Sequence, residues 1–386
     1  MTTSARDAGF DDEALSRLCK AIQDDIDDGR MFGASIIVAR RGKIGLQKVF
    51  GTVTPDGRAA CDDDIYLAMS VSKSFTATLV LRSIDQGRFT LDTKVVEILP
   101  DFAAGGKQNV TLRQLLNHTA GTFRGFLPPG ISAENLGNLD QYYASVASMP
   151  IEYVPGTQCV YNPSASYAVL GKILVATDPK ERNFRTIAKE ELFDPLGMEH
   201  SCFGLAEDHA DRVPVCHTEK QTNASTPMTQ NMLTKGCTNG NEIPAASAFC
   251  TIRDLFRFVE TMRQRGTNGE YRLMSKALFD YACKNHTGSL SNGALVPEKE
   301  ARNMPDSPAL YSLLGGYVRG EGHFLTGAGY TASPRAFYGI GGGSTMWMVD
   351  PDRDLSVCFL SAGFIEGLHH LERLSKINDL ALAACD

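Results

Sequence analysis

The sequence contains no Lys/Arg-rich run and no uninterrupted stretch of about 18 apolar residues, the length that a membrane-spanning helix requires. Because the formal net charge is −7, nucleic acid and membranes are not expected as partners. The first 20 residues lack the basic and apolar segments of a signal peptide, so we expect a cytoplasmic protein. At 386 residues, 43% hydrophobic and 22% charged, the chain has the composition and length of a globular protein with a large core.

Several common catalytic motifs are also missing. There is no C-x-x-C pair and no H-E-x-x-H, and the ten cysteines are scattered, as is typical of reduced thiols. The absence of G-x-S-x-G disfavours an α/β-hydrolase. The glycines of 339–344 do not form a dinucleotide loop, because the G-x-G-x-x-G spacing fails and a predicted strand follows. We therefore expect no cofactor and no metal ion.

Hydrophobic periodicity predicts the main elements of the chain. Helices are predicted over 11–29, 70–86, 112–117, 142–147, 167–176 and 368–384, and strands over 33–40, 43–50, 343–349 and 355–360. Because strands lie near both ends of the chain and helices lie between them, we expect an α/β (α+β) fold with one sheet built from both ends.

This pattern predicts two lobes with a site in the cleft between them. Residues 1–65 and 200–386 would form an α/β lobe, and residues 66–199 a mainly helical lobe. Two polar stretches, 218–244 and 287–308, are too long for simple connectors, so they are either surface loops that shape a pocket or mobile segments.

Residues 70–73, Ser-Val-Ser-Lys, form an S-x-x-K motif at the start of a predicted helix. Residues three apart share a helix face, so the Ser70 hydroxyl and the Lys73 amine can form a hydrogen bond. A serine needs a neighbouring base to become a nucleophile, and a lysine acts as that base only when its pKa is lowered. The apolar flanks 65–69 and 75–80 indicate that Lys73 is partly buried, which argues against a chance motif on a solvated helix face.

The motif resembles the first motif of the serine β-lactamase and penicillin-binding-protein superfamily, in particular its class C-like and esterase branch. Further segments are similar to family signatures in the same order: 91–100, 111–121, 192–198 and 247–258. The resemblance covers nearly the whole chain. It implies an antiparallel sheet flanked by helices with an inserted helical lobe, and acyl transfer through Ser70 with Lys73 as its base.

The second motif of this family, Tyr-x-Asn, implies a tyrosine that helps the lysine to move a proton. Tyr161, within 155–171, is the candidate, although Pro163 stands where the Asn is expected. An ungapped alignment would instead place Asn162 at the tyrosine position, so we also count Asn162 as a candidate substrate-binding residue. The alternative for Tyr161 is a packing role under its loop.

The third motif, Lys/His-x-Gly on an edge strand, is expected within 337–344. Tyr338 stands where family members often carry His or Lys, so the basic residue is absent. The glycines would let a substrate lie against the strand backbone. The N–H of Gly341 or Gly342 would complete an oxyanion hole with the N–H of Ser70. A glycine-rich turn without a catalytic role is the alternative.

The missing cation bears on the substrate, because in penicillin-recognising members it helps to hold the substrate carboxylate. Its loss favours a neutral ester, amide or lactone over a β-lactam, although Arg335 could supply a charge from nearby. His118 is expected to be a hydrogen-bonded core residue, and Trp347 to pack in the sheet or line the pocket.

Together these features favour a serine hydrolase that cleaves a small, uncharged ester, amide or lactone through an acyl-Ser70 intermediate. An acyltransferase to an alcohol or amine would use the same residues. A non-catalytic ligand-binding protein is a second alternative, because the second and third motifs are altered. A β-lactamase or cell-wall peptidase is disfavoured by the missing signal peptide and cation. The expected partner is a small-molecule substrate, and the sequence does not define an oligomeric state.

Overall fold

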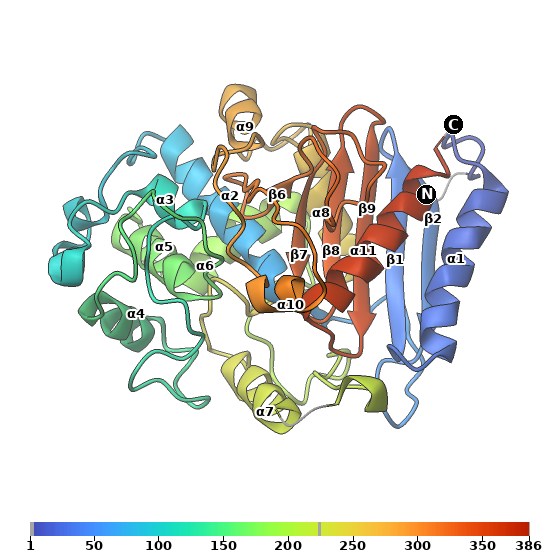
Figure 1. The fold of residues 1–386 in the computed structure, drawn as a ribbon, viewed down its shortest axis with the longest axis horizontal. Helices are drawn as coiled ribbons and strands as arrows, with labels where there is room; N and C mark the ends of the chain where they lie inside the picture. The colour runs from blue at the N-terminus through green and yellow to red at the C-terminus, as the bar shows by residue number, and fades with distance from the viewer. Residues whose placement is uncertain (1–3, 223–224, 386) are drawn as a thin grey trace.

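The computed structural model describes residues 4–222 and 225–385, and it contains one large and one small antiparallel sheet (Figure 1). The large sheet has the strand order β2-β1-β9-β8-β7-β6, and the small sheet has the order β3-β5-β4. The strands are β1 (Gly33–Arg40), β2 (Lys43–Gly51), β3 (Tyr66–Leu67), β4 (Cys202–Phe203), β5 (Ala248–Cys250), β6 (Tyr317–Val318), β7 (Phe337–Gly341), β8 (Thr345–Asp350) and β9 (Leu355–Ala362).

Eleven α-helices are assigned within the described residues. They are α1 (Asp12–Asp27), α2 (Ser72–Asp85), α3 (Leu112–Leu116), α4 (Leu139–Ser148), α5 (Ala165–Ala176), α6 (Phe184–Ala188), α7 (Thr226–Gly236), α8 (Ile252–Arg263), α9 (Lys276–Ala282), α10 (Val296–Ala301) and α11 (Gly367–Leu382). Residues 1–3, 223–224 and 386, which the predicted α/β lobe includes, lie outside the described residues.

The two ends of the chain meet inside the large sheet. β1 forms the predicted hairpin with β2 and also pairs antiparallel with β9, so that Gly33 lies opposite Ala362. This confirms the expectation of one sheet built from both ends. The expected edge position of the third-motif strand is wrong, because β6 pairs with β7 and places Tyr317 opposite Tyr338. A strand of two residues is too short to give a periodic signal in the sequence.

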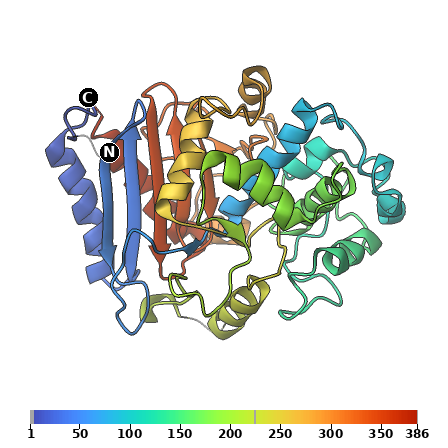
Figure 2. The same cartoon turned by 180° about the vertical axis from the view of Figure 1, so that it is seen from behind.

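Helices cover both faces of the large sheet. Figure 1 shows α1 and α11 on one face, and the reverse view in Figure 2 shows α8 on the other. Because alternate side chains of a strand point to opposite faces, Ile36 and Val38 of β1 pack with α1 and α11, whereas Ile37 joins the core that contains α8. β1 and β9 are buried along their whole length, as expected for a sheet covered on both faces.

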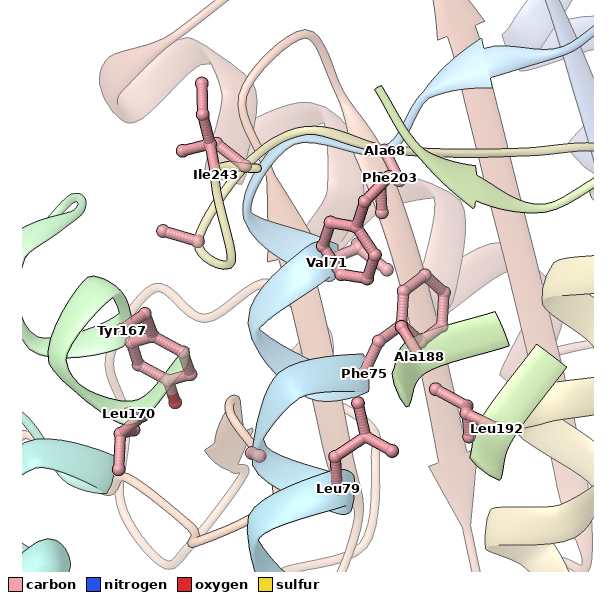
Figure 3. Packing of buried hydrophobic residues seen from close by; sticks show 14 of the residues in the cluster. Ala68, Val71, Phe75, Leu79, Tyr167, Leu170, Ala188, Leu192, Phe203 and Ile243 are labelled. Carbon is pink, nitrogen blue, oxygen red and sulfur yellow. The ribbon is translucent and has the colours of Figure 1, made fainter. Parts of the chain in front are cut away.

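Helix α2 runs through the interior, where buried residues of α5 (Tyr167, Leu170) and of the segment 188–192 pack around it (Figure 3). Its residues from Ser72 to Leu81 are all buried. Phe75 makes edge-to-face contacts with Phe193 and Phe258, at ring-centroid distances of 5.5 and 4.8 Å. Apolar residues therefore surround this helix, and the lysine of the S-x-x-K motif lies in the protein interior, as its flanks predicted.

The helices predicted between residues 66 and 199 are present as α2 to α5. One hydrophobic cluster runs from β1 and β9 through α2 to α5, so the core is continuous across the predicted lobe boundaries. The division into lobes at these boundaries therefore stays a prediction. Within the described part of the chain, no helix is long and apolar enough to cross a membrane.

Candidate active site

Ser70 lies in a strained turn that is fixed to both sheets. It belongs to the 3-10 turn Met69–Val71 directly before α2, and Met69 has a positive φ of 49°. A positive φ is costly for a residue with a side chain, so surrounding contacts must hold it. The neighbouring Ala68 supplies them, because its N–H donates to Ala248 O at 2.8 Å and its carbonyl accepts from Thr345 Oγ1 at 2.9 Å.

Ser70, Lys73 and Tyr161 meet as the motifs predicted. Lys73 Nζ lies 3.0 Å from Ser70 Oγ, and Tyr161 Oη lies 2.6 Å from the same oxygen. The serine comes from the 3-10 turn before α2 and the lysine from the first turn of α2, whereas the tyrosine comes from the loop before α5. The nucleophile candidate thus has an amine and a phenol in direct contact with its oxygen.

The surroundings of Lys73 suit a proton acceptor. The side chain is 1% exposed, and burial lowers the pKa of its ammonium to about 7. Nζ also donates to Pro163 O at 2.8 Å and to Ala245 O at 3.2 Å. A neutral amine has two N–H groups and one lone pair. With both N–H groups directed to these carbonyls, the lone pair faces Ser70 Oγ.

Tyr161 supplies the other end of this hydrogen-bonded chain. Burial raises the pKa of its phenol to about 12, so at neutral pH the hydroxyl carries its proton. When Lys73 is neutral and its lone pair accepts the Ser70 hydrogen, Tyr161 is the donor of the hydrogen bond to Ser70 Oγ. The ring of His118 lies beside Tyr161 at a centroid distance of 4.9 Å, and burial keeps the pKa of this histidine well below its ordinary value.

The structure places Asn162 away from the reacting atoms. Its side-chain amide donates to Thr122 Oγ1 at 3.1 Å, and its Oδ1 accepts from Ser166 N at 3.0 Å. The residue is 3% exposed and does not belong to the described lining of the cavity at Ser70. Both ends of the Asn162 amide are thus paired within the protein, with Thr122 on one side and the Ser166 N–H on the other. Its candidacy as a substrate-binding residue is therefore not supported by the geometry.

His118 and Trp347 have the structural contacts that we expected. His118 is buried and its Nδ1 accepts from Asn162 N at 3.1 Å, while its carbonyl accepts from Val160 N. Trp347 is buried in β8 and donates from Nε1 to Ser74 Oγ at 3.1 Å. Both residues fix the elements that carry Ser70, Lys73 and Tyr161.

The glycines at the end of β7 approach the nucleophile turn closely. A Cβ added to Gly341 would lie 3.0 Å from Ser70 N and 2.4 Å from Ala68 O. Only glycine fits this approach, and Gly341 and Gly342 both line the cavity with Ser70. The assignment of Gly341 or Gly342 as the second oxyanion donor stays a prediction, and the contact with the Ser70 amide supports Gly341.

Neither candidate replacement for the third-motif cation brings a positive charge to Ser70. Tyr338 lines the cavity, but its hydroxyl forms a 2.7 Å hydrogen bond with Thr326 Oγ1. Arg335 is exposed and pairs with Asp352, and it does not belong to the described cavity lining. The suggestion that Arg335 supplies the missing charge is therefore not supported.

Ser70 opens into a cavity of about 200 Å³. Its walls are mainly apolar and aromatic, including Leu310, Tyr317, Leu325 and Ile340. Parts of the polar stretch 287–308 line it and therefore shape the pocket rim, whereas no described residue of 218–244 does. The small, largely apolar space fits an acyl or alkyl group next to the nucleophile.

Sequence reasoning did not find several residues of this cavity. Lys299 of α10 lines it and donates from Nζ to Ser307 Oγ at 3.0 Å, and Glu366 before α11 also lines it. The carbonyl of Pro163 also accepts from Lys73, although the proline departs from the Asn that the second motif has at this position. Every residue has a backbone carbonyl, so the sequence could not indicate which carbonyl accepts from Lys73. Within the described residues, no cluster of three His, Cys, Asp or Glu side chains could hold a metal ion.

Comparisons with known proteins show the family of the chain. The family model described as Beta-lactamase matches residues 18–380, and the chain belongs to this family. Esterase EstB of Burkholderia gladioli is 30% identical over 215 residues, which cover 52% of this chain and 54% of that protein. Penicillin-binding protein 4 of Amycolatopsis lactamdurans is 32% identical over 165 residues, or 42% of each chain. The chain thus spans about half the length of the curated relatives that it matches.

Solved structures share the fold over almost the whole chain. The structure of EstCE1, titled a hydrolase with promiscuous acyltransferase activity, matches with a TM-score of 0.76 and 20% sequence identity. The match covers 95% of this chain and 98% of that one. It confirms the β-lactamase-like arrangement of an antiparallel sheet flanked by helices.

Proposed function

We propose that the protein is a serine hydrolase that cleaves a small, uncharged ester, amide or lactone through an acyl-Ser70 intermediate. The observation that carries this proposal is the contact of Ser70 Oγ with Lys73 Nζ at 3.0 Å and with Tyr161 Oη at 2.6 Å. A serine between a lysine of pKa about 7 and a protonated phenol has both the base and the acid that acyl transfer requires.

The proposed reaction begins when neutral Lys73 accepts the Ser70 proton and Ser70 Oγ bonds to the substrate carbonyl carbon. The oxyanion accepts hydrogen bonds from the N–H groups of Ser70 and Gly341. The tetrahedral intermediate then expels the leaving oxygen, which takes the proton of Tyr161, and the ammonium of Lys73 returns a proton to the phenolate. Water repeats these steps on the acyl-enzyme and releases the acid.

Support for an uncharged substrate comes from the cavity. The resemblance puts Tyr338 at the position of the third-motif cation, Tyr338 lines the cavity, and most of the remaining wall is apolar. Lys299 is the lysine other than Lys73 in the described lining, and its Nζ is already engaged, because it donates to Ser307 Oγ at 3.0 Å. A chromogenic cephalosporin is therefore expected to be a poor substrate.

The proposal is tested by hydrolysis of p-nitrophenyl acetate and butyrate by the wild type and by Ser70→Ala. We expect the variant to lose about 10³-fold or more in kcat/KM. Intact-mass measurement after rapid mixing should show one added butyryl group on the wild type and none on the variant. Equal activity of the two proteins would refute Ser70 as the nucleophile.

Acyl transfer to an alcohol is a second candidate. It is favoured by the fold match to EstCE1, whose title reports promiscuous acyltransferase activity for that protein. Adding a primary alcohol during turnover of p-nitrophenyl butyrate distinguishes the two. A butyrate ester of the alcohol forms in a transferase, whereas a strict hydrolase releases only butyrate.

A further inference from the structure

Residues 311–317 form a tight hairpin that is wedged between α2 and β7. Tyr311 and Tyr317 pair across it, and Ser312 N donates to Gly316 O at 3.0 Å. A Cβ on Gly315 would lie 2.4 Å from Lys73 O, and one on Gly316 would lie 2.1 Å from Tyr338 O. The hairpin therefore packs directly against the backbone of the S-x-x-K helix, and this contact fixes Tyr317 beside the active site.

The Tyr317 ring is held on both faces. Its centroid lies 4.5 Å from that of Tyr311 and 5.3 Å from that of Tyr338, with the latter pair stacked at 22°. Tyr317 lines the cavity together with Ser70 and Tyr161. Burial and then the neighbouring Tyr161 raise the Tyr317 pKa well above its ordinary value, so the hydroxyl keeps its proton.

The Tyr317 hydroxyl has a hydrogen to donate. Tyr311 Oη donates to Tyr317 Oη at 3.3 Å, so Tyr317 is the acceptor of that bond. Among the hydrogen bonds of the described residues, none has Tyr317 Oη as donor. The comparison with Tyr338 is direct, because that hydroxyl lines the same cavity but is already paired with Thr326.

We propose that Tyr317 is a substrate-binding residue whose hydroxyl donates a hydrogen bond to an oxygen of the ester outside its scissile carboxyl group. This proposal rests on the proposed hydrolase function and narrows its substrate class to esters with an ether, carbonyl or hydroxyl oxygen. A purely hydrocarbon ligand would leave the hydroxyl unpaired against apolar walls, which is unfavourable. An oxygen in the acyl or the alcohol part of the ester would accept the hydrogen bond of the Tyr317 hydroxyl.

Two pairs of isosteric esters locate this oxygen. On the acyl side, p-nitrophenyl 3-methoxypropanoate differs from p-nitrophenyl pentanoate by one oxygen in place of a methylene. On the alcohol side, 2-ethoxyethyl butyrate differs from pentyl butyrate in the same way. Since each pair has one shape, the ratio of kcat/KM within a pair reports the hydrogen bond. Dividing the variant's ratio by the wild-type ratio cancels the intrinsic reactivity of the esters.

The test variant is Tyr317→Phe, and the matched control is Tyr338→Phe. Both remove one phenol hydroxyl from the same cavity and keep the stacked ring. We expect Tyr317→Phe to lower the ether-to-hydrocarbon ratio by about tenfold in one pair, mainly through KM. In Tyr338→Phe the same ratio should stay at the wild-type value, whatever happens to the absolute rates.

An unchanged ratio in both pairs, or an equal fall in Tyr317→Phe and Tyr338→Phe, would overturn the assignment of Tyr317. The proposed hydrolase would still stand if Ser70-dependent hydrolysis of p-nitrophenyl butyrate persists. Binding by calorimetry in a Ser70→Ala background tests Tyr317 without turnover. The ether ester should bind about tenfold more tightly than its isostere, and Tyr317→Phe should abolish the difference. Equal binding of the two esters by Ser70→Ala would contradict the proposal even if the protein hydrolyses no ester.

Discussion

Lys73 and Lys107 are two buried lysines in similar surroundings. Each is 1% exposed, each donates to two backbone carbonyls, and each lies over an aromatic ring, Tyr161 or Phe102, at 5.0 and 5.3 Å. Burial lowers the pKa of both. They differ in their further contacts, because Lys73 Nζ also reaches Ser70 Oγ at 3.0 Å and lies over the Tyr167 ring at 5.6 Å, whereas the hydrogen bonds of Lys107 go only to backbone acceptors. Burial makes a lysine a potential base, and a nucleophile within hydrogen-bonding distance gives that base a role.

The largest expected effect is that of Lys73→Met on activity. Without the lone pair that accepts the Ser70 proton, kcat/KM for p-nitrophenyl butyrate should fall about 10³-fold. The measurement is steady-state kinetics, with circular dichroism to show that the variant is folded. A folded Lys73→Met protein with more than a tenth of wild-type activity would place the base elsewhere.

Tyr161→Phe tests the group on the other side of Ser70. The variant keeps the ring that packs against His118 and removes only the hydroxyl that contacts Ser70. We expect kcat to fall about 10²-fold, because protonation of the leaving group loses its donor. A larger effect on an alkyl ester than on a p-nitrophenyl ester would follow, since nitrophenolate leaves without a proton. Equal effects on both esters would contradict this role.

The pH dependence of kcat/KM distinguishes Lys73 from an ordinary lysine. Lys73 must be neutral to accept a proton, and its folded-state pKa is about 7. Activity should therefore fall about tenfold per unit as the pH drops below 7 and reach a plateau above it. Tyr161, with a pKa of about 12, remains protonated across that plateau. An inflection near pH 10 in place of pH 7 would show that burial does not tune this lysine.

Lys107→Met should change stability and leave activity within about twofold of wild type. Its removal leaves the carbonyls of Ala104 and Met149 without their Nζ donor, at a cost of about 2 kcal/mol in the free energy of unfolding. Urea denaturation of Lys107→Met and of the wild type measures this difference in the free energy of unfolding. A substantial loss of activity in this variant would remove the distinction between the two lysines.

Much of the fold could be predicted from sequence, because it rests on side-chain pattern. The helix of residues 12–27, the hairpin of residues 33–51 and the pairing of strands from both ends follow from periodicity. The S-x-x-K motif indicated Ser70 as the candidate nucleophile and Lys73 as its candidate base. The family resemblance added Tyr161 as the candidate tyrosine beside them. What escaped prediction depends on contacts between distant segments. The two-residue strand β6 has no pattern, and the Pro163 and Ala245 carbonyls are backbone groups that any residue could supply.

Two sequence expectations are not supported by the geometry for a related reason. Asn162 is next to Tyr161 in sequence, but neighbouring residues in a loop face different ways, and its Oδ1 accepts from Ser166 N. Arg335 lies near the β7 glycines in sequence, but Asp352 pairs with it at the surface. Lys107 gave no signal at all, because its segment is glycine-rich and polar and does not resemble a core. Closeness in sequence to a site residue did not predict which way the Asn162 and Arg335 side chains point.

The pairing of β1 with β9 has a consequence for how the chain folds. These neighbouring strands are separated by more than 300 residues of sequence, and Arg373 of α11 forms a buried ion pair with Asp25 of α1. During synthesis the edge of β1 that later pairs with β9 stays unpaired until residues 355–362 have left the ribosome. Such long-range pairing slows folding and exposes a strand edge to aggregation. Chaperone demand and expression temperature should therefore limit the yield of active protein more than the local stability of its helices does.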